Sequence, residues 1–73
     1  MLNVTLAKRR RKELGLTLAE VGEKVGVGRD VIHTWETGKR EPRNVESLRR
    51  YARALGVSLN ELGAEPESEA VSG

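Results

Sequence analysis

The side chains of this chain best suited to bind a ligand lie between residues 28 and 43, where basic and polar residues are concentrated. Lys39, Arg40 and Arg43 cluster in what reads as a loop, and mobile cations in a loop can reach phosphate groups. Glu41 interrupts the cluster, so an ordinary charged loop is the alternative interpretation. The chemistry indicated is the binding of an anion.

Catalytic chemistry has no comparable set of residues. The sequence offers no paired carboxylates at a suitable spacing, no nucleophile beside a base and no glycine-rich phosphate loop. There is no cysteine, and His33, the only histidine, lacks a second ligand at metal spacing. We therefore expect no enzyme activity, no metal, no cofactor and no small-molecule ligand.

The charge of the chain is distributed unevenly along its length. Residues 1–56 contain all thirteen Lys and Arg but only seven Asp and Glu, a net charge of +6, although the whole chain carries only +2. The remaining four acids, Glu61, Glu65, Glu67 and Glu69, make the C-terminal segment acidic. A basic domain of this kind suits a polyanion such as nucleic acid, and a merely solvated basic surface is the alternative.

With 73 residues the chain predicts one small domain that uses nearly all its core for folding. No segment approaches the roughly 20 apolar residues that span a bilayer, and the N-terminus lacks the apolar run of a signal peptide. We expect a protein of the cytoplasm that does not act at a membrane. The absence of cysteine fits a reducing compartment.

Two helices must position the polar residues. Thr17 and Glu20 have the spacing of a capping box, which predicts a helix from Thr17 to about Val25, where Gly26 ends it. Its apolar positions recur at helical spacing: Leu18, Val21, Gly22 and Val25. A second helix of about ten residues follows Gly28, with Val31, Ile32 and Trp35 facing the core.

The link between these helices is short and contains glycine, as a helix-turn-helix unit requires. Gly22 is expected where the two helices cross most closely, because a residue without Cβ permits that approach. Outward positions of the second helix then hold the polar residues, namely Arg29, Asp30, His33, Thr34 and Thr37.

The apolar pattern in the rest of the sequence predicts three further helices. The inner stripe of the first holds Leu6, Ala7, Arg10, Arg11 and Leu14, after a frayed segment from Met1 to Asn3. We expect the aliphatic part of Arg10 to pack while its guanidinium reaches solvent. A fourth helix, begun by Asn44 and ended by Gly56, turns Val45, Leu48, Tyr51, Ala52 and Leu55 inward, and a short fifth covers 59–62. The domain is thus residues 1–62, and residues 63–73 form an acidic tail expected to be disordered.

These motifs together resemble the phage-repressor and Cro-like helix-turn-helix proteins, the XRE family. The matching segments are GLT at 15–17, a small residue at 22, GV at 26–27, Ile32, WE at 35–36, G-x-R-x-P at 38–42 and ALGVSLNEL at 54–62. The resemblance implies an all-α, compact five-helix lambda-repressor-like domain. It also implies binding to a double-stranded DNA operator, commonly as a homodimer.

The resemblance places positions 29, 30 and 34 over the major groove, with Gly28 and His33 near its edges. Arg29 has the geometry to bind guanine O6 and N7, and Thr34 can meet an acceptor or the thymine methyl group. Asp30 either accepts from cytosine N4 or orients Arg29 and favours the helix N-terminus. His33 can contact DNA, at a base or at the backbone.

Phosphate contacts are expected from one further group of residues. They are Thr17, Gly28, Thr37, Lys39, Arg40 and Arg43. Leu18 stands where the family commonly has Gln, and it either packs inward or makes an apolar surface contact. The resemblance also suggests an ion pair between Arg11 and Glu36 across the core, against the alternative that both are solvated.

The favoured function is therefore sequence-specific DNA binding by a repressor-like regulator of transcription. The alternative is a protein-interaction module, such as a small antitoxin or an adaptor with the same fold. Leu18, Gly28 and Asp30 favour that alternative, since each departs from the DNA-facing pattern or adds unfavourable charge. The loop cations oppose it.

Overall fold

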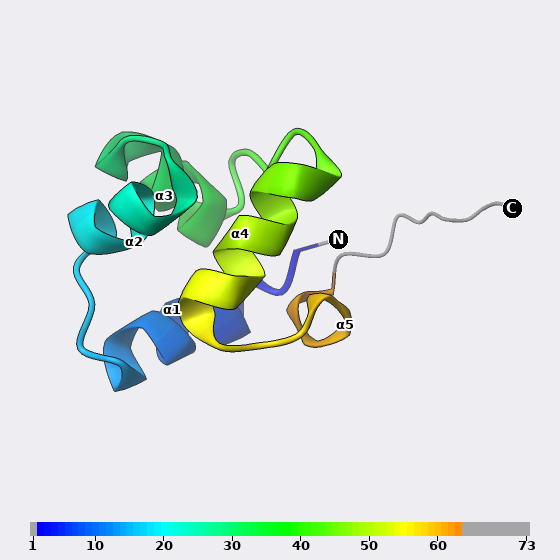
Figure 1. The fold of residues 1–73 in the computed structure, drawn as a ribbon, viewed down its shortest axis with the longest axis horizontal. Coiled ribbons are helices and arrows are strands. Elements are labelled where there is room, and N and C mark those ends of the chain that lie inside the picture. Colours follow the sequence, from blue (N-terminus) through cyan, green and yellow to red (C-terminus); the bar gives the residue numbers. More distant parts are fainter. Residues whose placement is uncertain (1, 64–73) are drawn as a thin grey trace, which may run out of the picture.

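A computed structural model describes residues 2–63, and within them the chain forms five helices and no strand (Figure 1). The helices are α1 (Val4–Glu13), α2 (Leu18–Val25), α3 (Arg29–Thr37), α4 (Val45–Leu55) and α5 (Leu59–Leu62). The predicted all-α, five-helix fold is confirmed. Gly63 ends α5 in the left-handed conformation, whereas the rest of the predicted acidic tail lies outside the described residues.

Local hydrogen bonds fix where the helices begin. The Thr17 hydroxyl accepts the Glu20 N–H at 3.1 Å, and the Glu20 carboxylate accepts the Thr17 N–H at 2.8 Å. Ser58 and Glu61 repeat this arrangement at the start of α5, with distances of 3.1 and 2.9 Å. Both predicted capping boxes are confirmed, which is why these boundaries could be predicted from spacing alone.

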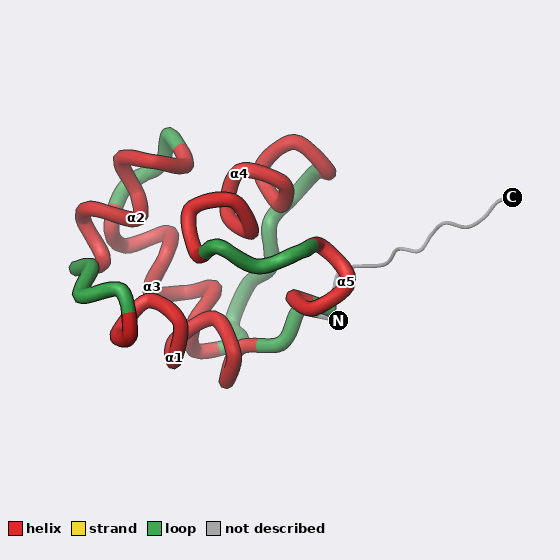
Figure 2. Tube along the Cα trace, turned by 60° about the horizontal axis from the view of Figure 1, so that its bottom comes forward, coloured by secondary structure: helices red, strands yellow, loops and turns green. Residues whose placement is uncertain are grey.

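The core lies where α2, α3 and α4 meet, and α1 and α5 close it (Figures 1 and 2). Its fully buried large side chains are Val21, Ile32, Tyr51, Leu55 and Leu62. Trp35 is also buried and meets Tyr51 edge to face, with ring centroids 4.9 Å apart. The prediction that Trp35 belongs to the core is confirmed. Short loops, green in Figure 2, connect the helices.

Three apolar residues that were predicted to face inward are exposed: Leu14 at 45%, Val31 at 37% and Val45 at 56%. Leu14 lies just beyond the last residue of α1, and Val45 is the first residue of α4, where each helix has left the core. Val31 lies beside Ile32, one helical step of about 100° away, and Ile32 occupies the inward position. Periodicity found the stripes but misjudged their edges.

The predicted fraying of the N-terminus is wrong for Leu2 and Asn3. Leu2 is buried in the core. The Asn3 N–H donates to the Leu62 carbonyl at 2.8 Å, and the Asn3 side-chain oxygen accepts the Leu6 N–H at 3.0 Å. Asn3 therefore caps α1 and joins the start of the domain to its end.

The Arg10 side chain is 29% exposed, as expected of a guanidinium that reaches solvent, but it also makes two contacts that the sequence did not indicate. Its Nε donates to the Leu55 carbonyl at 3.1 Å, and its Nη1 pairs with Glu13 at 2.8 Å. Leu55 is the last residue of α4, whose terminal carbonyls lack partners within the helix and carry partial negative charge. Arg10 thus ties α1 to the end of α4.

The Tyr51 hydroxyl is buried and has no hydrogen-bond partner among the described residues. Burial raises the pKa of this phenol well above its ordinary value of about 10; Glu36 raises it further and Arg11 opposes. Folding therefore favours the protonated phenol. The stability that comes from this difference in pKa between the folded and unfolded states is fully present below pH 10, and it is lost as the pH rises toward the higher pKa of the folded state.

We predict that Tyr51→Phe will leave the free energy of unfolding at pH 7 unchanged or raise it by up to about 1 kcal/mol, because an unpartnered hydroxyl is removed. Between pH 8 and pH 11 the wild type should lose about 1.4 kcal/mol more than the variant. Urea unfolding at both pH values measures this difference. Parallel losses in the two proteins would show that the folded state accommodates the phenolate.

Candidate nucleic-acid interface

Residues 26–28 form the turn that sets α3 against α2. Gly26 adopts a left-handed conformation (φ 93°), and the N–H groups of Gly26 and Val27 both donate to the Gly22 carbonyl, at 2.7 and 2.9 Å. A Cβ at Gly22 would lie 2.6 Å from the Val27 carbonyl oxygen. The close approach that requires glycine is therefore between α2 and the turn, not between the two helices as predicted.

The outer face of α3 holds all four residues predicted to read bases. Arg29, Asp30 and His33 are exposed, and Thr34 is half-buried. The opposite face is anchored by the buried side chains of Ile32 and Trp35. The core thus holds α3 in one rotation about its axis, and that rotation presents the polar residues to solvent.

The two threonine hydroxyls of α3 are already engaged within the helix. Thr34 Oγ1 donates to the Val31 carbonyl at 2.6 Å, and Thr37 Oγ1 donates to the Thr34 carbonyl at 3.2 Å. While these bonds persist, Thr34 offers a ligand only its lone pairs and its methyl group. Thr34 can therefore make fewer kinds of contact than the sequence suggested, because its hydroxyl can donate to an acceptor on a ligand only after the bond to the Val31 carbonyl breaks.

The basic loop after α3 is fastened to the same helix. The Thr34 carbonyl accepts the N–H groups of Lys39 and Arg40 at 3.0 and 3.2 Å. The side chains of Lys39, Arg40 and Arg43 are exposed, as is the intervening Glu41. The backbone of the loop is therefore positioned relative to α3, while its cationic side chains extend into solvent.

The start of α2 is less open to an anion than the sequence suggested. The N–H groups of Thr17 and Glu20 are taken up by the capping box, and the Glu20 carboxylate adds negative charge there. The Thr17 hydroxyl acts as an acceptor in that box, which leaves its proton for another partner. Leu18 is half-buried and packs against the core, which agrees with the inward alternative.

At the start of α3, Gly28 is the N-cap residue but supplies no side-chain cap. Its position is exposed, and a Cβ there would meet no atom within 4 Å. Asp30 lies in the first turn, where the helix dipole favours a negative charge. That placement agrees with the prediction that Asp30 favours the N-terminus of the helix. Acceptance of a hydrogen bond from cytosine N4 remains the alternative role.

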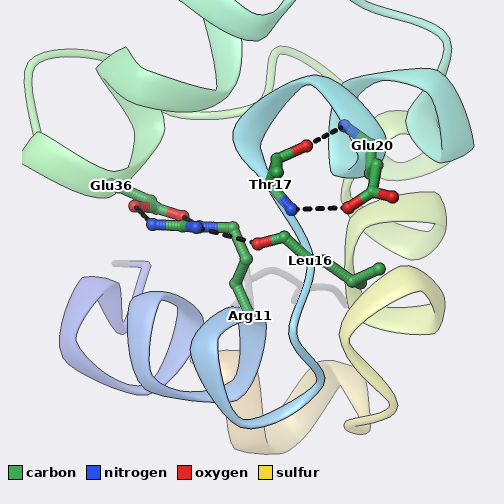
Figure 3. Close-up of polar contacts among 5 residues, drawn as sticks. All are labelled: Arg11, Leu16, Thr17, Glu20 and Glu36. Carbon is green, nitrogen blue, oxygen red and sulfur yellow. Dashed lines mark hydrogen bonds and ion pairs between the residues drawn. The ribbon is translucent and has the colours of Figure 1, made fainter.

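Arg11 and Glu36 form a nearly buried ion pair between α1 and α3 (Figure 3). Two contacts join them, Nε to Oε2 at 2.6 Å and Nη2 to Oε1 at 3.2 Å, and Arg11 Nη1 also donates to the Leu16 carbonyl at 2.9 Å. The hydrogen bond to Glu36 raises the pKa of Arg11, against the cost of burial. The pair holds the C-terminal half of α3 in place.

A groove lies away from the outer face of α3. Its lining residues are Val4, Thr5, Lys8, Arg9, Lys12, Glu13 and Glu36. None of them belongs to the residues predicted to contact bases or phosphates. Within residues 2–63 no helix is long and apolar enough to cross a membrane, and no group of three metal-binding side chains comes together.

One residue at the border of the outer face of α3 was assigned to the core on the basis of the sequence. Val31 is exposed, although it was assigned to the core with Ile32 and Trp35. On a helical wheel, Val31 lies about 70° from the midpoint of those two residues. That angle was the available signal that Val31 borders the polar face.

Two helices joined by a tight turn within a small helical core define a helix-turn-helix domain. The chain belongs to the helix-turn-helix family, whose model matches residues 8–62, and the resemblance to repressor and Cro-like proteins is confirmed. An uncharacterized HTH-type transcriptional regulator of Methanothermobacter thermautotrophicus is 48% identical over 52 residues, which are 71% of this chain and 74% of that protein.

Solved structures show the same fold. The P22 c2 repressor in complex with synthetic operator 9T has a TM-score of 0.78 at 35% identity, over 85% of this chain and 92% of the repressor chain. The N-terminal DNA-binding domain of SinR from Bacillus subtilis has a TM-score of 0.72 at 28% identity, over 89% and 94% of the two chains.

Proposed function

We propose that this protein is a repressor-like transcriptional regulator that binds double-stranded DNA in a sequence-specific manner. The observation that carries the proposal is the outer face of α3, where Arg29, Asp30, His33 and Thr34 lie beside a basic loop that the Thr34 carbonyl fastens to the same helix. The similar P22 c2 repressor was solved with an operator, which supports it. A protein-interaction role is not favoured, because the exposed cations suit phosphates.

In this proposal α3 enters the major groove, and its N-terminal residues contact base edges. Arg29 binds guanine through O6 and N7, and Asp30 either accepts from cytosine N4 or orients Arg29. Thr34 offers lone pairs and a methyl group, and His33 contacts a base or the backbone at the edge. Side-chain chemistry and the location of these residues on the outer face of α3 support the proposed roles.

Phosphate contacts flank the reading helix. Lys39, Arg40 and Arg43 neutralise phosphates from the loop, and the Thr17 hydroxyl donates from the start of α2. Gly28 contributes through its backbone alone. Thr37 can donate to a phosphate only by releasing the Thr34 carbonyl, so its contribution should be the smallest of the set.

We further propose that the protein binds as a homodimer in the cytoplasm. One recognition helix reads few base pairs, and two related half-sites about one helical turn, roughly 34 Å, apart would double that number. Selection of bound duplexes from a random library at about 150 mM salt tests sequence-specific binding and dimeric binding together, since salt at this concentration suppresses non-specific binding. One enriched palindrome supports them, and its half-site spacing reports the dimer geometry.

The effect of a substitution on binding to random DNA should distinguish residues that contact bases from residues that contact phosphates. Arg29→Ala is expected to cost about 1–3 kcal/mol on the selected site and to relax one base position, because a bidentate base contact is lost. Lys39→Ala should weaken binding to all sequences and reduce the salt slope by about one. Titrations of specific and random duplexes at several salt concentrations measure both effects.

Arg53→Ala is the matched control, since Arg53 is exposed on α4 and has no proposed role in reading DNA. It should leave specific binding nearly unchanged. Equal losses on specific and random DNA for Arg29→Ala would remove Arg29 from base reading. Absence of any enriched sequence from a folded protein would contradict the proposed function itself.

A further inference from the structure

We infer that the acidic segment formed by residues 64–73 binds, within the same chain, in the groove beside α1. Six residues of α1 line this groove, together with Glu36 of α3. The groove lies away from the outer face of α3, so a segment bound there leaves the proposed DNA-reading residues free. Three features support such binding: the cations of the groove, the spacing of the acids and the place where the segment begins.

Lys8 and Lys12 carry charge that the groove does not neutralise. Both are exposed, and neither forms an ion pair within residues 2–63. They lie one turn apart on the same face of α1, about 6 Å along the helix axis, so they repel each other. Arg9 lines the groove beside them, and its contact with Glu13 is long, at 3.8 Å, and exposed. An acidic ligand would relieve this repulsion.

The two acids that line the groove are engaged elsewhere. Glu36 is nearly buried and holds Arg11 through two contacts, at 2.6 and 3.2 Å. Glu13 pairs with Arg10 at 2.8 Å. A carboxylate that enters the groove therefore meets the cations of α1 without having to displace an acid from them.

The acidic segment has the complementary charge at a matching spacing. Glu65, Glu67 and Glu69 occupy alternate positions, and residues 64–73 contain no Lys or Arg. In an extended chain, alternate side chains point to the same side and lie about 6.6 Å apart. This interval is close to the separation of Lys8 and Lys12, so two successive glutamates can meet both lysines at once.

The segment begins at one end of the groove. The Leu62 carbonyl accepts the Asn3 N–H at 2.8 Å, so α5 lies beside the start of α1 (Figure 1). Val4, the first residue of α1, lines the groove. The helix is about 15 Å long, whereas ten extended residues span up to about 33 Å. A tether this short gives an effective concentration of about millimolar, which favours binding within one chain over binding to a second copy.

A spin label on the segment tests this inference in the full chain. The sequence has no cysteine, so Ser72→Cys offers a single site for a nitroxide. Paramagnetic broadening of backbone amide signals then reports which residues the segment approaches. At low ionic strength, broadening at residues 8–13 should exceed that in the same labelled chain with Glu65→Gln, Glu67→Gln and Glu69→Gln by about twofold, because exposed ion pairs are individually weak. Salt at 1 M, where the Debye length is about 3 Å, should abolish this excess.

Substitutions in the groove provide the matched comparison. Lys8→Gln combined with Lys12→Gln should lower the broadening of α1 to the level of the variant with neutral glutamines. Lys24→Gln combined with Arg53→Gln removes two exposed cations outside the groove and should leave that broadening unchanged. Equal decreases in the two variants would show that the segment responds only to the net charge of the domain, which would overturn the inference. The dispersion of the amide signals shows that each variant is folded.

A mixed sample distinguishes binding within one chain from binding between chains. It combines spin-labelled chains without isotope and isotope-labelled chains without the nitroxide. Excess broadening of α1 in this mixture would assign the groove to the segment of a second copy and overturn binding within the chain. No excess in any sample would overturn the groove as the site. These samples contain no DNA, so either failure leaves the proposed function to be decided by the selection of bound duplexes.

Discussion

Replacing Arg11 by Met is expected to lower the free energy of unfolding by about 3–5 kcal/mol, one of the largest effects of a single substitution in this chain. The side chains of Arg11 and Glu36 are only 13% and 6% exposed, and the substitution leaves the Glu36 carboxylate nearly buried without its cationic partner. It also leaves the Leu16 carbonyl without the Arg11 N–H. Chemical denaturation monitored by Trp35 fluorescence measures the loss.

The cost should come from the isolated charge more than from the lost attraction. A buried pair gains little over apolar residues of similar volume, whereas a single unpaired buried charge is strongly unfavourable. We therefore expect Arg11→Met combined with Glu36→Leu to recover much of the stability lost by Arg11→Met. The two residues would then show a large coupling energy in a double-mutant cycle.

Arg50→Met is the matched control, because it breaks a pair of similar length in an exposed setting. Arg50 and Glu46 are 2.9 Å apart, but their side chains are 55% and 58% exposed. The expected loss is below about 1 kcal/mol. A similar loss for Arg11→Met, or no recovery in the double variant, would show that burial of the Arg11–Glu36 pair is not what makes it important.

The helix boundaries could be predicted because short-range chemistry determines them. The capping boxes that begin at Thr17 and Ser58 use bonds between residues three apart, and both were visible as sequence spacing. Gly26 and Gly56 end their helices in the left-handed conformation for which glycine is suited. In each case the information lies within a few residues of the boundary.

Long-range contacts could not be read in the same way. Arg10 donates to Leu55, 45 residues away, and nothing local to either residue indicates the bond. Leu2 belongs to the core and Asn3 bonds Leu62 only because α5 returns to the start of α1. Such contacts depend on how the helices pack, which periodicity does not specify.

The outer face of α3 was predicted largely correctly because the buried stripe determines it by exclusion. Once Ile32 and Trp35 face inward, positions such as Arg29, Asp30 and His33 must face solvent. Residues at the border of the stripe, such as Val31, are decided by packing details. The bond from Thr34 to the Val31 carbonyl depends on a rotamer, so the sequence left the chemistry of Thr34 too broad.

The turn offers the second large effect, through Gly22→Ala. A Cβ at this position would lie 2.6 Å from the Val27 carbonyl oxygen and 3.2 and 3.3 Å from the carbonyl carbon and oxygen of Gly28. All three are backbone atoms, so the clash cannot be relieved by rotating a side chain. Alanine gains about 1 kcal/mol in helix propensity, but we expect a net loss of about 1–3 kcal/mol because the turn must shift.

Gly28→Ser is the control for substitution of a glycine in the same segment. A side chain there meets no atom within 4 Å, the φ of −77° suits any residue, and the hydroxyl can cap α3. We expect this variant to gain a few tenths of a kcal/mol. Thermal unfolding of both variants compares substitutions that differ chiefly in the space available to the new atoms.

The shift of the turn also has a consequence for binding, because Gly28 is where α3 begins. If Gly22→Ala displaces the start of α3, binding to the selected site should weaken more than binding to random DNA, since base contacts need closer positioning than phosphate contacts do. Measurement well below the unfolding temperature of the variant separates this effect from loss of folded protein. Equal stability of Gly22→Ala and wild type would mean that the turn accommodates a methyl group, and specific binding should then be unaffected as well.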